Sequence, residues 1–287
     1  PKVPQGWGRR KDFNMRAACL VLLLAHASAF APPSALPLAR SALPAAAHRH
    51  APLRTAGQSV QMFEFGRFAK TLTFFNGNPL LKLLGLGKTP SIPRPEPVQG
   101  GQFGRETVLW DFESLSDKEF AAVWAPLDDV VMGGVSTSDI ERAPHGATLK
   151  GATSSKNNGG FCSARTRNVI PGFNIEGKSS IAVRVRCERG MRYKIIIRDA
   201  EGWDTVAWCH SFDTKKGQWM DLKVPLSSFI PVFRGNTLKG EKKPASIDKS
   251  SIFSAQMMLS KYEYDGALNP NFQEGPFELQ FGPIRAV

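Results

Sequence analysis

The sequence predicts an all-β domain with the architecture of a jelly-roll sandwich. Apolar and polar residues alternate in several short runs, of which 181–187 is the clearest. Pro, Gly and Asn punctuate the gaps between these runs. Only one helix signal occurs between residues 105 and 287. Many short strands with almost no helix indicate two packed sheets.

Residues 1–61 are predicted to be upstream sequence followed by a two-part targeting leader. We take Met15 as the start of translation, so that residues 1–14 would be translated upstream sequence. Arg16, the apolar run 17–25 and the Ala-Ser-Ala at 27–29 then have the form of a secretory signal. The apolar run is too short to span a bilayer.

The second part of this leader has the composition of a transit peptide. It begins with Phe30 and contains arginines but no acid before Glu64. A signal followed by such a segment resembles the bipartite presequence of algae with complex, red-derived plastids. A plastid (chloroplast) location at the stromal periphery of the thylakoid membrane is therefore expected, with a plain secreted protein as the alternative. A mitochondrial presequence fits less well, because the first apolar run is not amphipathic.

Residues 62–89 are predicted to form an amphipathic helical segment. Its apolar positions fall on helical faces, and a first helix should stop at Gly77. The segment would either anchor the protein on a membrane or membrane complex, or pack on its own domain. The predicted anchor residues are Phe65, Phe68, Leu72, Phe75, Leu80, Leu83 and Leu84.

Residues 90–104 are predicted to be an extended linker, because they contain four prolines and a Gly-Gly pair. The domain boundary is placed here, and the β-sandwich domain is expected to span residues 105–287. Within it, Ser116 and Glu119 form a capping box, which predicts a short helix over residues 117–123. The runs 181–187 and 193–197 are predicted to form a hairpin. Further strands are expected at 203–212, 218–224, 253–259 and 277–281.

Two segments of unusual composition are predicted to form one corner of the fold. The first, 124–138, contains an adjacent Asp pair and a Gly-Gly pair, and the second, 157–161, contains another Gly-Gly pair followed by Phe. The carboxylates would accept backbone N–H bonds, coordinate Ca²⁺ or perform acid–base chemistry, and the first role is favoured because one pair provides too few calcium ligands. The residues of this corner are Trp124, Asp128, Asp129, Gly133, Gly134, Ser136, Asn158, Gly159, Gly160 and Phe161.

The pairing of these two segments resembles the domain of complex I intermediate-associated protein 30. The resemblance runs from about residue 108 to 284 and includes the segments 229–235 and 275–279. It implies a fold like that of galactose-binding jelly rolls and a role in assembling large membrane redox complexes. It also implies that Trp124 and Phe161 pack inside a shared structural corner.

Charge is concentrated at the N-terminus. The chain has a net charge of +12, but residues 1–102 hold 13 Lys and Arg against 3 acids, and the remainder holds 24 against 22. This distribution argues against a nucleic-acid-binding body. A basic ridge on the predicted hairpin would dock an acidic protein surface, lipid headgroups or RNA, or would simply be solvated. The predicted protein-docking residues are Arg184, Arg186, Arg192, Lys194, Arg198 and Arg234.

No set of residues typical of catalysis or metal binding is visible in the sequence. The body has two histidines, His145 and His210, and no Ser/His/Asp or Cys/His set accompanies them. The body cysteines have no Cys-x-x-Cys spacing, so buried free thiols are expected, and neither a metal nor a cofactor is predicted.

The sequence therefore predicts a non-enzymatic assembly factor, chaperone or accessory subunit of a thylakoid complex in photosynthesis. Photosystem I is the expected partner, by analogy of location, and the protein alone is expected to be monomeric. A mitochondrial complex I assembly factor is the first alternative. A carbohydrate-binding module, using Trp203, Trp208 and Trp219, is the second, and a glycan hydrolase with two carboxylates across a cleft is the third.

Overall fold

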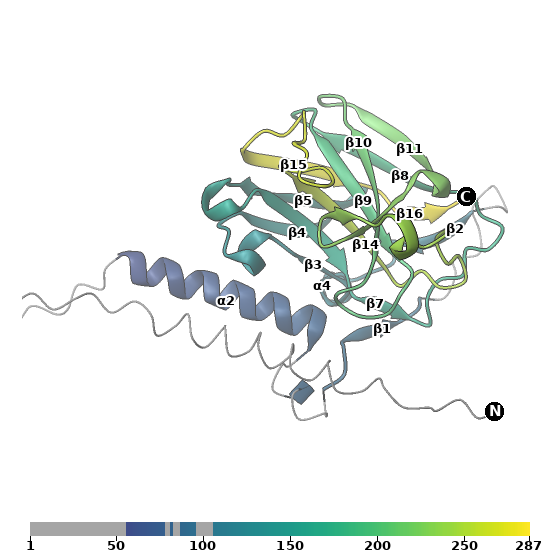
Figure 1. The fold of residues 1–287 in the computed structure, drawn as a ribbon, viewed down its shortest axis with the longest axis horizontal. Coiled ribbons are helices and arrows are strands. Elements are labelled where there is room, and N and C mark those ends of the chain that lie inside the picture. Colours follow the sequence, from purple (N-terminus) through teal and green to yellow (C-terminus); the bar gives the residue numbers. More distant parts are fainter. Residues whose placement is uncertain (1–55, 78–80, 83–86, 96–105) are drawn as a thin grey trace, which may run out of the picture. The chain divides into compact units, whose positions relative to one another are not determined.

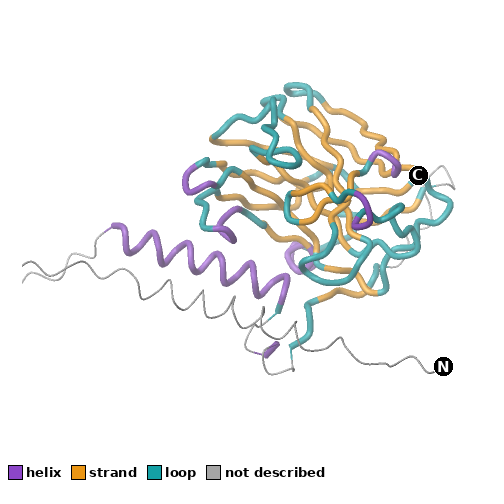
Figure 2. Tube along the Cα trace, viewed as in Figure 1, coloured by secondary structure: helices purple, strands orange, loops and turns teal. Residues whose placement is uncertain are grey.

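A computed structural model of the chain describes residues 56–77, 81–82, 87–95 and 106–287 (Figures 1 and 2). All of these residues belong to one structural unit, Arg54–Val287. The architecture is a sandwich of two mainly antiparallel sheets, as the sequence predicts.

The first sheet has the strand order β2-β16-β8-β15-β5-β4, and β11 pairs with the other edge of β8. The β15–β5 pairing joins the C-terminal part of the chain to the segment that follows the Asp pair. The strands are β2 (Thr107–Trp110), β4 (Thr137–Ala143), β5 (Gly146–Thr153), β8 (Ser180–Cys187), β11 (Trp219–Pro225), β15 (Gly275–Phe281) and β16 (Ile284–Ala286).

The second sheet has the strand order β13-β12-β10-β9-β14-β6-β3. Along β9, Tyr193, Ile195 and Ile197 enter the core between the sheets, so the alternate residues belong to the outer face of this sheet. The strands are β3 (Trp124–Pro126), β6 (Phe161–Thr166), β9 (Arg192–Arg198), β10 (Ala207–Asp213), β12 (Ile230–Phe233), β13 (Asn236–Thr237) and β14 (Ser254–Ser260).

The predicted capping-box helix is confirmed as α4 (Asp117–Val123). Ser116 Oγ accepts a hydrogen bond from the Glu119 N–H, and the Glu119 carboxylate accepts one from the Ser116 N–H. Phe120 is buried and fixes the helix on the core. Short 3₁₀ helices fill several connections: η1 (Asp129–Met132), η2 (Lys156–Asn158), η3 (Leu226–Ser228) and η4 (Gly240–Lys242).

The N-terminal segment contains the helix α2 (Ala56–Asn76), which starts before the predicted residue 62. Gly77 ends it with φ 77° and an N–H bond to the Thr73 carbonyl, as predicted. The predicted second helix lies almost wholly outside the described residues. Part of the predicted linker is a strand, β1 (Ser91–Pro93), which pairs in parallel with β7 (Asn168–Ile170). Among the residues that the structure describes, no helix has the length and apolar character needed to cross a bilayer.

The predicted hairpin is wrong, because β8 and β9 belong to different sheets. Both strands bury their apolar side chains in the same core. An alternating sequence allows this burial whichever of the two sheets the strand belongs to. The predicted ridge does not form. Arg184 and Arg186 lie on the first sheet, whereas Arg192, Lys194 and Arg198 lie on the second.

Candidate functional site

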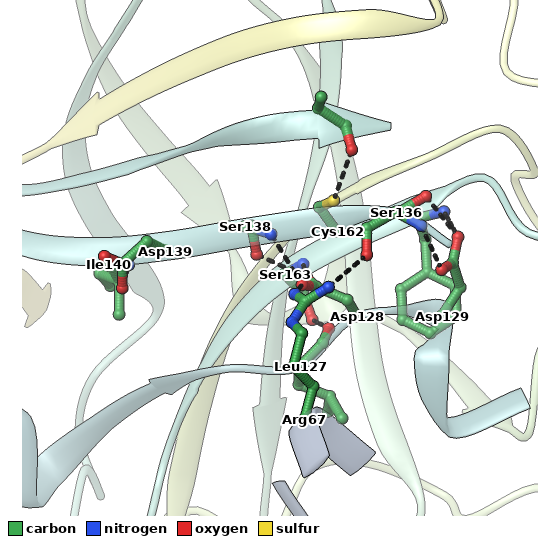
Figure 3. A network of polar contacts seen from close by, with 12 residues as sticks. Arg67, Leu127, Asp128, Asp129, Ser136, Ser138, Asp139, Ile140, Cys162 and Ser163 are labelled. Carbon is green, nitrogen blue, oxygen red and sulfur yellow. Dashed lines mark hydrogen bonds and ion pairs between the residues drawn. The ribbon is translucent and has the colours of Figure 1, made fainter. Parts of the chain in front are cut away.

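The two segments rich in Asp and Gly meet around the buried carboxylate of Asp129 (Figure 3). Asp129 Oδ1 accepts a bond from the Ser136 N–H at 2.9 Å. Asp129 Oδ2 accepts bonds from Ser136 Oγ at 2.5 Å, the Gly160 N–H at 2.6 Å and the Phe161 N–H at 3.2 Å. One carboxylate therefore holds together the start of η1, the start of β4 and the start of β6.

The glycines of the two pairs have different roles in this corner. A Cβ on Gly134 would lie 2.3 Å from Asp129 Cγ, and one on Gly159 would lie 2.5 Å from Asp129 Oδ2. Gly133 and Gly160 instead have positive φ values of 88° and 126°. In each pair, one glycine leaves the space that the Asp129 carboxylate occupies, and the other adopts a positive φ at the turn.

Asp128 binds a second set of donors and connects the corner to α2. Its side chain accepts bonds from the Ser138 N–H and Oγ, and Arg67 Nη2 lies 2.7 Å from Asp128 Oδ2. Figure 3 shows Arg67 reaching this carboxylate from α2. Burial raises the pKa of Asp128 above its ordinary value, and the Ser138 bonds and the charge of Arg67 oppose this rise.

These contacts indicate that the two carboxylates have a structural role. All four carboxylate oxygens of Asp128 and Asp129 accept bonds from protein donors, so a cation would have to displace those donors to bind there. In the described part of the chain, no group of three or more His, Cys, Asp or Glu residues is placed to hold a metal ion. Cys162 lies beside the corner, and burial raises the pKa of its thiol.

The aromatic residues of the two segments differ in burial. Trp124 is buried against Phe112 and Phe281, with both ring centroids 5.7 Å away. Phe161 is half-buried and lines a cavity on the outer face of the second sheet, so the expectation that it packs inside the corner is wrong. Asn158 has φ 59° and is exposed.

Helix α2 contacts the body near its C-terminal end as well as through Arg67. Phe75 is buried, and its ring centroid lies 5.1 Å from that of Trp203. Arg167 donates to the Phe74 carbonyl and places its guanidinium 4.0 Å from the Phe74 ring centroid. The predicted anchor residues Phe68 and Leu72 are half-buried, whereas the side chains of Phe65, Leu80, Leu83 and Leu84 lie outside the described residues.

The substitution Arg67→Met should loosen α2 and destabilise the body by about 2 kcal/mol, since it removes a charge-assisted bond to a buried carboxylate. Faster proteolysis within residues 56–76 and a lower melting temperature would register the change. Lys70→Met, at an exposed position of the same helix, is the matched control. Equal proteolysis rates for the two variants would contradict a fastening role for Arg67.

The predicted docking cations are mostly engaged within the protein. Arg184, Arg186 and Arg192 each form an ion pair with a carboxylate. Arg234 pairs with Asp204 and remains 70% exposed at its side chain. Lys194 is buried and donates to two backbone carbonyls.

The three tryptophans considered for sugar binding do not share a surface. Trp208 is buried in the core, where its Nε1 donates to Asp199. Trp219 lies on the first sheet beside Arg184, and Trp203 lines the cavity of the second sheet. They form no common stacking platform.

This cavity, which has a volume of about 750 Å³, was not predicted from the sequence. It lies over β9, β14 and β6, and its polar floor includes Arg165 and Gln256, neither of which was singled out. The available signal was the alternation in β6 and β14, which places a charged and an amide side chain on the outer face of a sheet.

Comparison with known proteins identifies a family. The family model described as complex I intermediate-associated protein 30 (CIA30) matches residues 110–281. No match was found among curated proteins.

Solved structures with a similar fold include carbohydrate-binding modules. The family 11 module of the cellulase Lic26A-Cel5E of Clostridium thermocellum is 17% identical, with a TM-score of 0.43 over 63% of this chain and 94% of that chain. The Clostridium thermocellum family 11 module in complex with a mixed-linked tetrasaccharide gives a TM-score of 0.41 at 17% identity, over 63% and 95% of the two chains. An agarase, AgWH50C, is 13% identical with a TM-score of 0.41, over 63% and 24%. Such likeness concerns the fold alone.

Proposed function

The chain belongs to the complex I intermediate-associated protein 30 family, and we propose that it is a non-enzymatic assembly factor or accessory subunit of photosystem I at the stromal face of the plastid thylakoid membrane. The family match over residues 110–281 carries the assembly role, since this is a family of assembly factors linked to complex I. The signal-like run and the acid-poor, arginine-containing stretch before Glu64 support the plastid location.

The geometry of the Asp128–Asp129 corner supports a docking role over a catalytic one. Its carboxylates bind backbone and side-chain donors of their own chain, and Arg67 uses one of them to hold α2. The corner thus fixes the position of the helix that precedes the family domain. In this proposal the apolar segment 62–89 contacts the body, where Phe75 is buried and Phe68 and Leu72 are half-buried, and also provides the contact with the membrane complex.

The test is mass spectrometry across a native gel of gently solubilised algal membranes. Co-migration with intact photosystem I, or with its late subcomplexes, is expected. Migration with fragments of mitochondrial complex I would overturn the plastid proposal and assign the family's respiratory role instead. Migration without any membrane complex would overturn the assembly role itself.

Deleting residues 63–87 should release most of the protein from thylakoid membranes, because the deletion removes the proposed apolar anchor. Quantitative immunoblotting of washed membranes and of the soluble fraction measures this release. Lys70→Met is the control, since it changes an exposed position of the same helix and keeps both the Arg67–Asp128 ion pair and every apolar anchor residue. A deletion variant that still sediments fully with the membranes would rule the anchor out.

A further inference from the structure

The cavity over the second sheet contains an uncommon arrangement of buried charge. Arg165 on β6 and Arg198 on β9 are 3% and 8% exposed, although arginine is rarely buried without a carboxylate partner. Gln256 lies opposite Arg165 in the β6–β14 register, and its Oε1 accepts a bond from Arg198 Nη2 at 3.0 Å. The three side chains therefore form one group on the outer face of the sheet.

Some hydrogen-bond donors of this group have no acceptor within the described residues. Arg165 donates from Nη1 and Nη2 to the backbone carbonyls of Trp203 and Gly202. Arg165 Nε, Arg198 Nε and Arg198 Nη1 are buried and have no hydrogen-bond partner within the described residues. Neither guanidinium forms an ion pair with a described carboxylate. Leaving such donors unpaired is costly, because they have lost their water.

The other charges around the cavity compensate this group only in part, although the charge of Asp204 acts favourably on both arginines. Asp204 pairs with Arg234, and Glu263 lies near Lys194 and accepts a bond from Ser211 Oγ at 2.5 Å. The lining therefore contains two more cations than carboxylates. Burial lowers the pKa of Arg165, and the neighbouring charge of Arg198 lowers it further, but an arginine keeps its proton at neutral pH.

Apolar side chains surround this cationic group. Ile196, Cys209 and Val232 form a small cluster on the outer face, separate from the main core, with Met258 packed against it. The Trp203 ring lies 5.0 Å from the Arg165 guanidinium. A volume of about 750 Å³ is in the range of sites for small organic ligands.

We propose that this cavity is a binding site for a small organic anion, whose carboxylate or phosphate group binds Arg165 and Arg198 and whose apolar part packs against Ile196, Val232 and Met258. The anion neutralises two neighbouring positive charges that line the cavity. A planar guanidinium is suited to both oxyanions, because its fork of donors matches their oxygens. This binding site goes beyond the proposed assembly role, although Phe68 and Leu72 of α2 also line the cavity.

The experiment uses the full chain and four probes, three of which have the same six-carbon chain. Hexyl phosphate, hexanoate, hexanol and inorganic phosphate are titrated by calorimetry, and the Nε–H signals of arginine are followed by NMR. Hexyl phosphate or hexanoate should bind more tightly than hexanol or inorganic phosphate, and the stronger of the two identifies the headgroup. The Nε–H signals of Arg165 and Arg198 should shift on binding. Equal binding of hexanol, or no saturable binding by any probe, would overturn the proposal.

Variants locate the site. Arg165→Met and Arg198→Met should each weaken binding about tenfold or more, the effect expected for one charge-assisted contact. Arg198→Lys keeps the positive charge but loses the forked guanidinium donors, so it should weaken binding less than Arg198→Met. It keeps the site testable if the methionine variant does not fold. Arg142→Met, whose arginine pairs with Asp117 outside the cavity, is the control. Unchanged binding in folded Arg165 and Arg198 variants, or a mixed-linked glucan tetrasaccharide binding more tightly than both anions, would refute the site.

Discussion

Replacing Asp129 with alanine should lower the melting temperature of the protein by about 10 °C, the shift expected for a loss of about 4 kcal/mol in a domain of this size. The carboxylate is fully buried and accepts four hydrogen bonds. Its removal leaves the N–H groups of Ser136 and Gly160 buried with no acceptor. The cost of desolvating those donors is then no longer offset, and thermal unfolding followed by circular dichroism measures it.

Asp139→Asn is the matched control for this substitution. Asp139 is exposed, and its carboxylate accepts a bond from the adjacent Ile140 N–H. Its replacement should change the melting temperature by about 1 °C at most, as is usual at the surface. An unchanged melting temperature in Asp129→Ala, together with the loss of a measurable calcium affinity, would show that the corner is a metal site instead.

Local signals in the sequence predicted the local structure well. The capping box at Ser116 specified α4, because its two reciprocal bonds depend only on residues three positions apart. Gly77 specified the end of α2 for a similar reason. Alternation located β8, β9, β11, β14 and β15 to within two residues, although the strand expected over 203–212 begins only at Ala207.

The pairing of strands within each sheet could not be predicted from these local signals. A period of two says which side chains of a strand are buried, but not which sheet provides the burial. The short connection from β8 to β9 crosses from one sheet to the other, and so separates cations that a hairpin would have joined. The basic ridge was therefore predicted on a hairpin that the protein does not form.

The Asp and Gly residues of the corner could be predicted from the sequence, whereas the roles of Arg67 and Arg165 could not. Two Gly-Gly pairs beside an Asp pair indicated a shaped corner, because glycine marks positions of close approach or positive φ. Arg67 and Arg165 gave no comparable signal, since their partners lie far away in the chain. Their roles depend on long-range packing that no single segment encodes.

Gly134→Ala should destabilise the protein by about 3 kcal/mol, a large cost for one added methyl group. The new Cβ would lie 2.3 Å from both Cγ and Oδ1 of Asp129, far inside van der Waals contact. The carboxylate cannot retreat without breaking its bonds to Ser136 and Gly160. Chemical denaturation with a constant m-value measures the loss.

Gly133→Ala provides the contrast, because it tests backbone conformation without a clash. Gly133 has φ 88°, and a Cβ added there would have no atom within 4 Å, so alanine should cost about 1 kcal/mol. The decisive comparison is Gly134→Ala in an Asp129→Ala background. If the carboxylate causes most of the clash, the glycine substitution costs only about 1 kcal/mol there, because the Cβ of residue 129 remains 2.8 Å from the new Cβ, and a double-mutant cycle gives a coupling energy of about 2 kcal/mol. Additive losses would instead mean that Gly134 is required by the backbone alone.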